Sequence, residues 1–209
     1  MLTLYAHPLS SYCWKALAAL YENNTPFELA LLESPESWAA FKRLWPIGKM
    51  PLLQDSDRGA VVPEASIVIE YLDQHYRGAT RFIPDDADAA REVRLKDRLF
   101  DLYLQGPMQR ITNEILSPER SNTAITQAKE QLRTAYGVLE QHFEGPFAAG
   151  ESFSMADCAA LPALFYGDTR TPLTGFPKLT AYLERLKQRP SIARVLNEAA
   201  PYLHMVPKE

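Results

Sequence analysis

The sequence predicts an α/β domain at the N-terminus followed by an all-α domain at the C-terminus. Over the first 75 or so residues, short runs with the period of a strand alternate with runs that have the period of a helix. Residues 76–87, which include Gly78 and Pro84, are typical of a linker. Beyond the linker, apolar residues recur at helical spacing. A chain of 209 residues is long enough for two small domains.

The N-terminal part begins with a short strand, Leu2–Tyr5, which His7-Pro8 ends. A helix is expected from Ser10 or Ser11 to about Glu22, because its apolar residues fall at helical spacing. The elements after it are predicted in the order strand 27–31, short helix 38–44, strand 51–54, turn 57–59, strand 60–62 and helix 65–75. The two strands around the turn are expected to form a hairpin.

The C-terminal part is predicted to be helical. Leu95, Leu99 and Leu102 share one helix face. Gly106-Pro107 is expected to bend or end that helix, because proline removes an intrahelical hydrogen bond. A longer helix is predicted from apolar residues that recur every three or four positions, namely Ile125, Ala128, Leu132, Ala135, Leu139 and Phe143. A further helix over 179–186 should stop before Pro190.

Another helix start is predicted at residues 153–158, Phe-Ser-Met-Ala-Asp-Cys. Ser154 is the expected N-cap and Asp157 the reciprocal acceptor of a capping box, while Phe153 should pack on Cys158. Loss of such a cap costs about 1 kcal/mol of stability. In this position Cys158 is interpreted as a small core residue rather than a reactive thiol.

Charge and composition argue against several classes of function. The chain carries 22 Lys and Arg against 26 Asp and Glu, a formal net charge of -4, and has no basic stripe that could neutralise nucleic-acid phosphates. No apolar run reaches the roughly 18 residues of a membrane span, and the first residues do not resemble a secretory signal. Cys13 and Cys158 have neither C-x-x-C nor zinc-binding spacing, so we expect no metal and a reducing, cytoplasmic compartment.

Three short segments carry candidate binding chemistry, and each also has a purely structural explanation. A hydroxyl of Ser10 or Ser11, in the turn before the first helix, can donate a hydrogen bond to an anion or simply cap the helix. A cis bond at Pro51 would turn the backbone of Met50 towards a ligand, but a proline there can also merely begin a strand. Glu64 can pair with an ammonium group or stabilise the dipole of the next helix.

Taken together, these segments resemble the glutathione transferases. The matching stretches are SSYCWKAL at 10–17, FKRLWPIGKMPLL at 41–53, PEASIVIEYL at 63–72 and FSMADCAAL at 153–161. The resemblance is to a serine-type, bacterial-like member of the cytosolic family. It implies a thioredoxin-like glutathione-binding domain over 1–76, a linker over 77–87 and an all-helical domain over 88–209 that forms the wall of the electrophile site. It also implies a cytoplasmic homodimer that uses glutathione as co-substrate in detoxification.

The resemblance implies roles for individual residues. Ser10 matches the hydroxyl that hydrogen-bonds the glutathione sulfur, and Ser11 is the fallback. The other glutathione-binding assignments are the backbone of Met50 for the cysteinyl part, Pro51 as the cis-proline, Glu64 for the γ-glutamyl end and Lys49 for the glycine carboxylate.

Position 65 departs from the family pattern. The family usually has a Glu-Ser pair here, whereas this chain has Glu64-Ala65, and Ser66 comes one position late. The hydroxyl that would bind the γ-glutamyl carboxylate is therefore missing, which should affect the affinity for glutathione. The candidates for the electrophile site in the helical domain are Tyr103, Met108 and Phe165, and each is at least as well explained as a core residue.

The function expected from the resemblance is activation of the glutathione thiol for attack on a small apolar electrophile. One alternative is a glutathione-dependent peroxidase or reductase. Disulfide exchange by the protein itself is disfavoured, since Ser10-x-x-Cys13 lacks the first cysteine of a C-x-x-C motif. Another alternative is a non-catalytic interaction module with a decayed glutathione site. Ala65 favours it, and the retained Ser10, Pro51 and Glu64 oppose it.

Overall fold

A four-stranded mixed sheet organises the N-terminal part in a computed structural model, which describes residues 1–208. The strands are β1 (Leu2–Ala6), β2 (Glu28–Leu31), β3 (Leu52–Asp55) and β4 (Ala60–Pro63), in the spatial order β2-β1-β3-β4. β1 pairs in parallel with β2 and antiparallel with β3, which pairs antiparallel with β4. A parallel pair needs a crossover connection, and helix α1 (Ser11–Glu22) supplies it.

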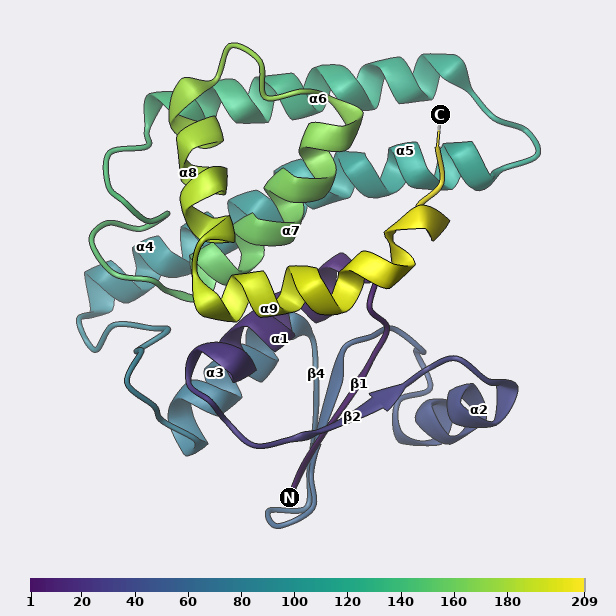
Figure 1. The fold of residues 1–209 in the computed structure, drawn as a ribbon, viewed down its shortest axis with the longest axis vertical. Coiled ribbons are helices and arrows are strands. Elements are labelled where there is room, and N and C mark those ends of the chain that lie inside the picture. Colours follow the sequence, from purple (N-terminus) through teal and green to yellow (C-terminus); the bar gives the residue numbers. More distant parts are fainter. Residues whose placement is uncertain (209) are drawn as a thin grey trace.

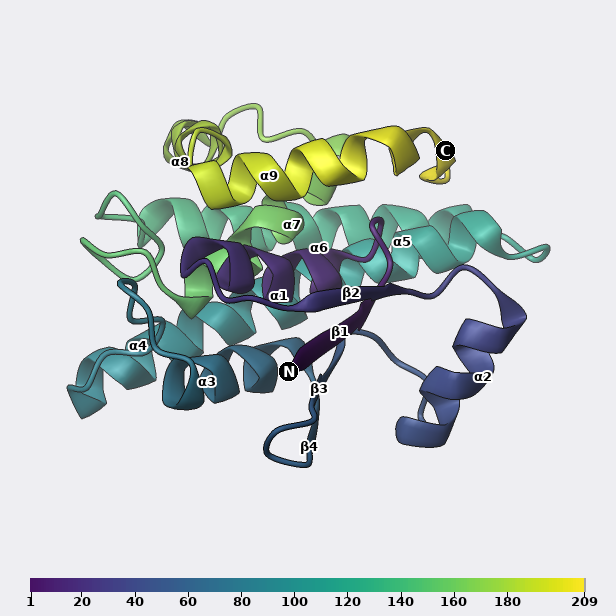
Figure 2. The same ribbon diagram turned by 60° about the horizontal axis from the view of Figure 1, so that its bottom comes forward.

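Alternating side chains along the strands give the sheet two packed faces. On β1, Leu4 belongs to the main core, whereas its neighbour Tyr5 packs on the other face against Phe41, with ring centroids 5.9 Å apart. Helices α1 and α3 (Ala65–His75) cover the first face, and α2 (Pro35–Leu44) lies on the second (Figure 2). α1 therefore lies between the sheet and the rest of the molecule.

The C-terminal part is built of helices (Figure 1). In chain order these are α4 (Ala87–Arg98), the π-helix η1 (Leu99–Gln105), α5 (Gly106–Leu116), α6 (Asn122–Gln141), α7 (Met155–Arg170), α8 (Pro177–Lys187), α9 (Pro190–Ala199) and the 3-10 helix η2 (Ala200–Met205). α7 is buried over most of its length, and both α7 and α9 pack against α1. None of the helices within residues 1–208 has both the length and the apolar character that a membrane span requires.

The predicted α/β-then-all-α organisation is confirmed, and the largest differences occur at prolines. The helix through Leu102 does not end at Gly106-Pro107: it widens into η1 and continues as α5. Because a π-helix bonds each carbonyl five residues ahead, the bulk and the missing N–H of Pro107 are accommodated without a break. Pro162 lies inside α7. Pro190, where a helix was expected to have stopped, begins α9, which the sequence analysis did not predict.

Two of the three leucines predicted to share a face of the first C-terminal helix lie on the surface, whereas Leu99 is partly buried and packs against the core. The side chains of Leu95 and Leu102 are 49% and 58% exposed, and Val138 of α6, also on the surface, is 46% exposed. Leu99, Leu102 and Val138 line a groove of about 840 Å³ between η1, α5 and α6. Apolar residues at helical spacing can thus face a groove on the surface as well as the core of their own chain.

Candidate functional site

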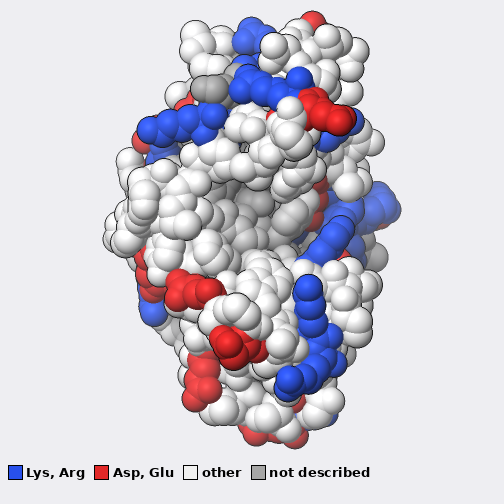
Figure 3. All heavy atoms as spheres, turned by 90° about the vertical axis from the view of Figure 1, so that its right-hand side faces the viewer, with Lys and Arg blue, Asp and Glu red and all other residues white. Residues whose placement is uncertain are grey.

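A cavity of about 570 Å³ lies between the two parts of the chain, beyond the last residue of β1. Its lining includes Ser10 and Ser11 from the turn into α1, Met50, Met108 of α5 and Tyr166 of α7. Figure 3 faces the side on which the C-terminus and α2 lie, and it shows the surface hollowed between the two halves, with mostly uncharged residues around the hollow. A largely apolar cavity of this size with a few hydroxyl groups is typical of a small-molecule site.

Ser10 is the N-cap of α1, as the structural interpretation of this residue predicts. Its backbone is extended, and its Oγ accepts a hydrogen bond from the N–H of Cys13 at 3.3 Å. Because that bond uses an oxygen lone pair, the hydroxyl hydrogen of Ser10 can still be donated to a ligand. Ser11, the first residue of α1, is only 9% exposed. Capping and anion binding are therefore compatible roles for Ser10.

Two side chains hold the turn that carries Ser10. The indole N–H of Trp14 donates to the carbonyl of Pro8 at 2.5 Å, and the hydroxyl of Tyr166 donates to the carbonyl of Leu9 at 3.0 Å. The rings of Trp14 and Tyr166 also pack together, with centroids 4.8 Å apart. The helical domain thus takes part in placing the hydroxyl of Ser10. Tyr166 and Leu9 are 157 positions apart, and no local pattern in the sequence indicates their contact.

The segment before β3 brings a second candidate to the same cavity. The Met50–Pro51 peptide bond is cis, as the sequence analysis anticipated for a binding segment. Met50 lines the cavity with Ser10, Pro51 is buried next to β3, and Lys49 is exposed outside this lining. Two of the segments singled out by their sequence, one following β1 and one preceding β3, therefore meet at one site.

Glu64 lies at the N-terminus of α3 in an unusual backbone conformation. Its φ of +70° falls in the left-handed region, which residues other than glycine rarely adopt and which is enriched at ligand sites. The side chain is exposed and makes no capping hydrogen bond, so the helix does not use its carboxylate. Ala65 is 5% exposed and begins α3. Glu64 and Ala65 lie outside the lining of the 570 Å³ cavity.

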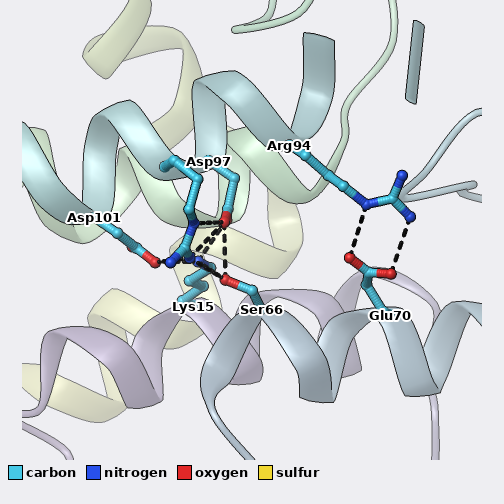
Figure 4. Close-up of polar contacts among 7 residues, drawn as sticks. Lys15, Ser66, Glu70, Arg94, Asp97 and Asp101 are labelled. Atoms are coloured by element: carbon cyan, nitrogen blue, oxygen red, sulfur yellow. Dashed lines mark hydrogen bonds and ion pairs between the residues drawn. The ribbon is translucent and has the colours of Figure 1, made fainter. Parts of the chain in front are cut away.

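Lys15 is at the centre of a buried ion cluster that the sequence analysis missed (Figure 4). Its Nζ lies 2.5 Å from Asp97 and 2.8 Å from Asp101, and it donates to Oγ of Ser66 at 2.7 Å. The Ser66 hydroxyl donates to Asp97 at 2.8 Å. Arg98 donates to Ser66 and Asp101 at 2.6 Å and to Asp97 at 2.8 Å. The side chains of Lys15 and Asp97 are each 1% exposed.

This Lys15–Ser66–Asp97–Arg98–Asp101 cluster joins α1, α3, α4 and η1. A signal for it was present in the sequence, because position 15 places a lysine inside an otherwise apolar run, WKALAAL at 14–20. A buried lysine needs acidic partners, but the sequence does not show which ones. The cluster is a network of ion pairs: within residues 1–208, no three or more His, Cys, Asp or Glu side chains are grouped so that they could hold a metal ion.

Burial governs the titration of groups near the turn. Burial, and then the charge of Asp101, raise the pKa of Tyr12 to about 12. Burial also raises the pKa of Asp101, although the charge of Lys15 opposes the shift. Cys13 is fully buried, which raises the pKa of its thiol to about 11. That thiol is therefore protonated at neutral pH and shielded from substrates, so it is unsuited to disulfide exchange.

The three candidates for the electrophile site lie in different surroundings. Met108 lines the cavity together with Ser10. Phe165 lines a neighbouring cavity of about 490 Å³, which shares Tyr166 with the first. Tyr103 is 58% exposed and lines the groove between η1 and α6. The fold therefore brings Ser10 and Met108 together, places Phe165 beside them and leaves Tyr103 on a separate surface.

Comparison with known proteins assigns both halves of the chain to one family. The family model "Glutathione S-transferase, N-terminal domain" matches residues 4–80, and "Glutathione S-transferase, C-terminal domain" matches residues 122–185. Glutathione S-transferase A of Pleuronectes platessa is 30% identical over 194 residues, covering 86% of this chain and 84% of the relative. Glutathione S-transferase-like protein OpS6 of Beauveria bassiana is 27% identical over 206 residues, covering 92% and 93%.

The fold agrees with this assignment. A crystal structure of a glutathione S-transferase from Methylobacillus flagellatus with glutathione bound superimposes with a TM-score of 0.84, at 24% identity, over 93% of this chain and 98% of the other. The shared architecture is a thioredoxin-like domain followed by an all-α domain, as the sheet order and the helices above describe. By sequence over both halves and by fold, this chain belongs to the glutathione S-transferase family.

Proposed function

We propose that the protein is an enzyme that activates the thiol of glutathione for attack on a small apolar electrophile. The observation that carries the proposal is the position of Ser10: this residue lines an interdomain cavity at a helix N-terminus, and its capping bond to the N–H of Cys13 uses only an oxygen lone pair. In the reaction, the thiolate sulfur forms a bond to an electrophilic carbon. The leaving group departs with its electron pair, and the thiol proton passes to solvent.

The energetics of thiol activation match what this turn can supply. An unperturbed thiol has a pKa of about 8.5, and lowering it by two units requires about 2.7 kcal/mol of preferential stabilisation of the thiolate. One hydrogen bond to a charged acceptor contributes about 1.5–3 kcal/mol. The hydroxyl of Ser10 can provide one such bond, and the first N–H groups of α1, which have no intrahelical partner, can provide more. Ser11 remains the alternative donor.

The proposal places the rest of glutathione along the surface between Met50 and α3. The backbone of Met50 would pair with the cysteinyl part, next to the cis Pro51, and the exposed Lys49 would reach the glycine carboxylate. The exposed Glu64 would hold the γ-glutamyl ammonium. The electrophile would then lie against Met108 in the apolar cavity, close enough to the sulfur for proximity to contribute to the rate.

We further propose that the protein is a cytoplasmic homodimer. The reaction needs reduced glutathione, and the cytosol keeps thiols reduced. The groove between η1, α5 and α6, in which Leu102 and Val138 are exposed, offers a second copy an apolar surface. A glutathione peroxidase or reductase that uses its own cysteine is not favoured, because Cys13 is buried.

Replacing Ser10 tests the proposed reaction. We expect Ser10→Ala to lower turnover roughly tenfold to a hundredfold, the equivalent of the charged hydrogen bond it removes. The pKa of bound glutathione, followed by the ultraviolet absorbance of the thiolate, should rise, while glutathione binding changes little. Ser10→Thr, which keeps the hydroxyl and the cap, is the control, and Ser11→Ala tests the alternative donor. If the thiolate titrates unchanged in Ser10→Ala, then Ser10 acts only as a helix cap.

Replacing Glu64 tests the proposed orientation of the ligand. We expect Glu64→Ala to weaken glutathione binding about tenfold, because it removes the partner of the γ-glutamyl ammonium. Glu70→Ala, which removes another carboxylate of α3, should leave the affinity unchanged. Calorimetric titration measures both. If the wild-type protein neither binds glutathione in calorimetry nor is retained on immobilised glutathione, the chain is better explained as a non-catalytic interaction module.

A further inference from the structure

The ion cluster around Ser66 bears on the missing hydroxyl at position 65. Under the proposed function, the γ-glutamyl end of glutathione lies at the N-terminus of α3 and carries a carboxylate beside its ammonium. Ala65 offers that carboxylate no side-chain donor, and Ser66 cannot replace it. The Ser66 hydroxyl donates its hydrogen to Asp97, and its oxygen accepts from both Lys15 and Arg98, so its capacity is fully used.

Arg98 is the part of the cluster that reaches the surface. Its side chain is 48% exposed, whereas Asp97 and Asp101 are 1% and 8% exposed. Its Nη2 is 2.6 Å from Oγ of Ser66, which puts the guanidinium beside the first turn of α3. The contacts of Arg98 within residues 1–208 use Nε and Nη2, and none involves Nη1. Two N–H donors of the planar group are therefore left for a ligand.

The buried members of the cluster hold this guanidinium in place. Asp97 accepts from Nε at 3.2 Å and from Nη2 at 2.8 Å, and Asp101 accepts from Nη2 at 2.6 Å. Asp97 and Asp101 carry two negative charges, of which Arg98 balances one. Lys15, whose Nζ contacts both carboxylates, balances the other (Figure 4). Two cations thus balance two anions, and the arginine side chain is fixed before any ligand arrives, which lowers the entropic cost of binding.

We propose that Arg98 binds the α-carboxylate of the γ-glutamyl group and thereby takes the place of the hydroxyl absent at position 65. This inference rests on the proposed function. Glu64 and Arg98 then form a complementary pair. The exposed carboxylate of Glu64 holds the ammonium of the ligand, and the exposed edge of the Arg98 guanidinium holds the carboxylate of the ligand. A peptide that begins with this zwitterion is therefore selected over one that lacks either charge. The electrostatic coupling of Tyr12 to both Arg98 and Glu64 agrees with their proximity.

Two analogues of glutathione separate the two charges. Glutaryl-cysteinylglycine lacks the ammonium, and γ-aminobutyryl-cysteinylglycine lacks the carboxylate. By calorimetric titration, Arg98→Met should weaken the binding of glutathione and of the glutaryl analogue about tenfold, the change that 1.4 kcal/mol produces. Its affinity for the γ-aminobutyryl analogue should equal that of the wild type. Glu64→Ala should weaken the binding of glutathione and of the γ-aminobutyryl analogue, and it should leave the affinity for the glutaryl analogue unchanged.

Controls separate ligand binding from loss of structure. Arg94→Met removes an arginine one turn earlier on α4, which also pairs with α3, through Glu70 at 2.9 and 3.0 Å, and it should leave all three affinities unchanged. Arg98→Lys keeps a positive charge near Asp97 and Asp101 but loses the planar group. If Arg98→Met proves too unstable to titrate, Arg98→Lys should show a smaller loss with the same selectivity. Adding Ala65→Ser to Arg98→Met should restore most of the glutathione affinity.

The outcomes distinguish this inference from the proposed function. A wild-type protein that binds no glutathione overturns both. If Glu64→Ala weakens glutathione and Arg98→Met does not, the ligand is in the proposed orientation and Arg98 is not its partner. If Arg98→Met weakens all three peptides equally, the residue only supports the structure, and the inference is wrong.

Discussion

Asp157→Ala is expected to lower the free energy of unfolding by about 3–5 kcal/mol, well above the roughly 1 kcal/mol of an ordinary cap. The capping box is present, but Asp157 does more than cap. It is 0% exposed and accepts hydrogen bonds from the N–H and hydroxyl of Ser154 at 2.8 and 2.9 Å, from the N–H of Ala148 at 2.8 Å and from the hydroxyl of Tyr182 at 2.6 Å. Alanine would leave these donors buried without a partner.

Chemical denaturation of the wild type and of two variants measures this effect. Asp157→Asn keeps the volume of the side chain and one accepting oxygen, so it should lose about half as much stability as Asp157→Ala. Burial raises the pKa of Asp157, so the carboxylate itself is costly and the loss stays below the sum of its four bonds. Glutathione affinity should be unchanged in both variants. A loss of only about 1 kcal/mol would mean that Ala148 and Tyr182 find other partners.

Lys15→Met is expected to destabilise the protein by about 3–5 kcal/mol, because it leaves the buried carboxylates of Asp97 and Asp101 with only Arg98 as a cation. The loss should be largest at neutral pH. Burial already raises the pKa of Asp101 and Lys15 lowers it, so removing Lys15 raises it further. As the pH falls through that raised value, protonation removes the unpaired charge, and the difference between variant and wild type should shrink.

Denaturation at several pH values, with a matched variant, tests this account of the cluster. Arg91→Met removes a cation of α4 that pairs with Asp88 at 2.6 Å on the surface, where the two side chains are 77% and 82% exposed, and it should cost at most about 0.5 kcal/mol. Combining Lys15→Met with Asp97→Asn and Asp101→Asn should recover much of the lost stability, because no buried charge is left unpaired. A Lys15→Met variant with the stability of the wild type at every pH would contradict it.

Much of the local structure could be predicted because short-range chemistry decides it. The bounds of α3 match the predicted 65–75, and α1 begins at Ser11 after the N-cap that the sequence indicates. Capping, strand alternation and helical periodicity each depend on residues only a few positions apart. Short-range patterns did not predict the backbone at Pro107 and Pro162. There the surrounding helices hold the chain in a helical path despite the missing N–H groups.

By itself, the sequence determined the order of the elements in the N-terminal half, the division into an α/β and an all-α half, and the short segments around Ser10, Met50 and Glu64. Only the tertiary structure decided that Ser10 and Met50 share a cavity and that the Ser66 hydroxyl is already used. The physical reason is that the strength of an ion pair or hydrogen bond depends on burial and on partners distant in the chain. Lys15 meets Ser66 across 51 positions and Asp101 across 86, contacts that a sequence pattern does not encode.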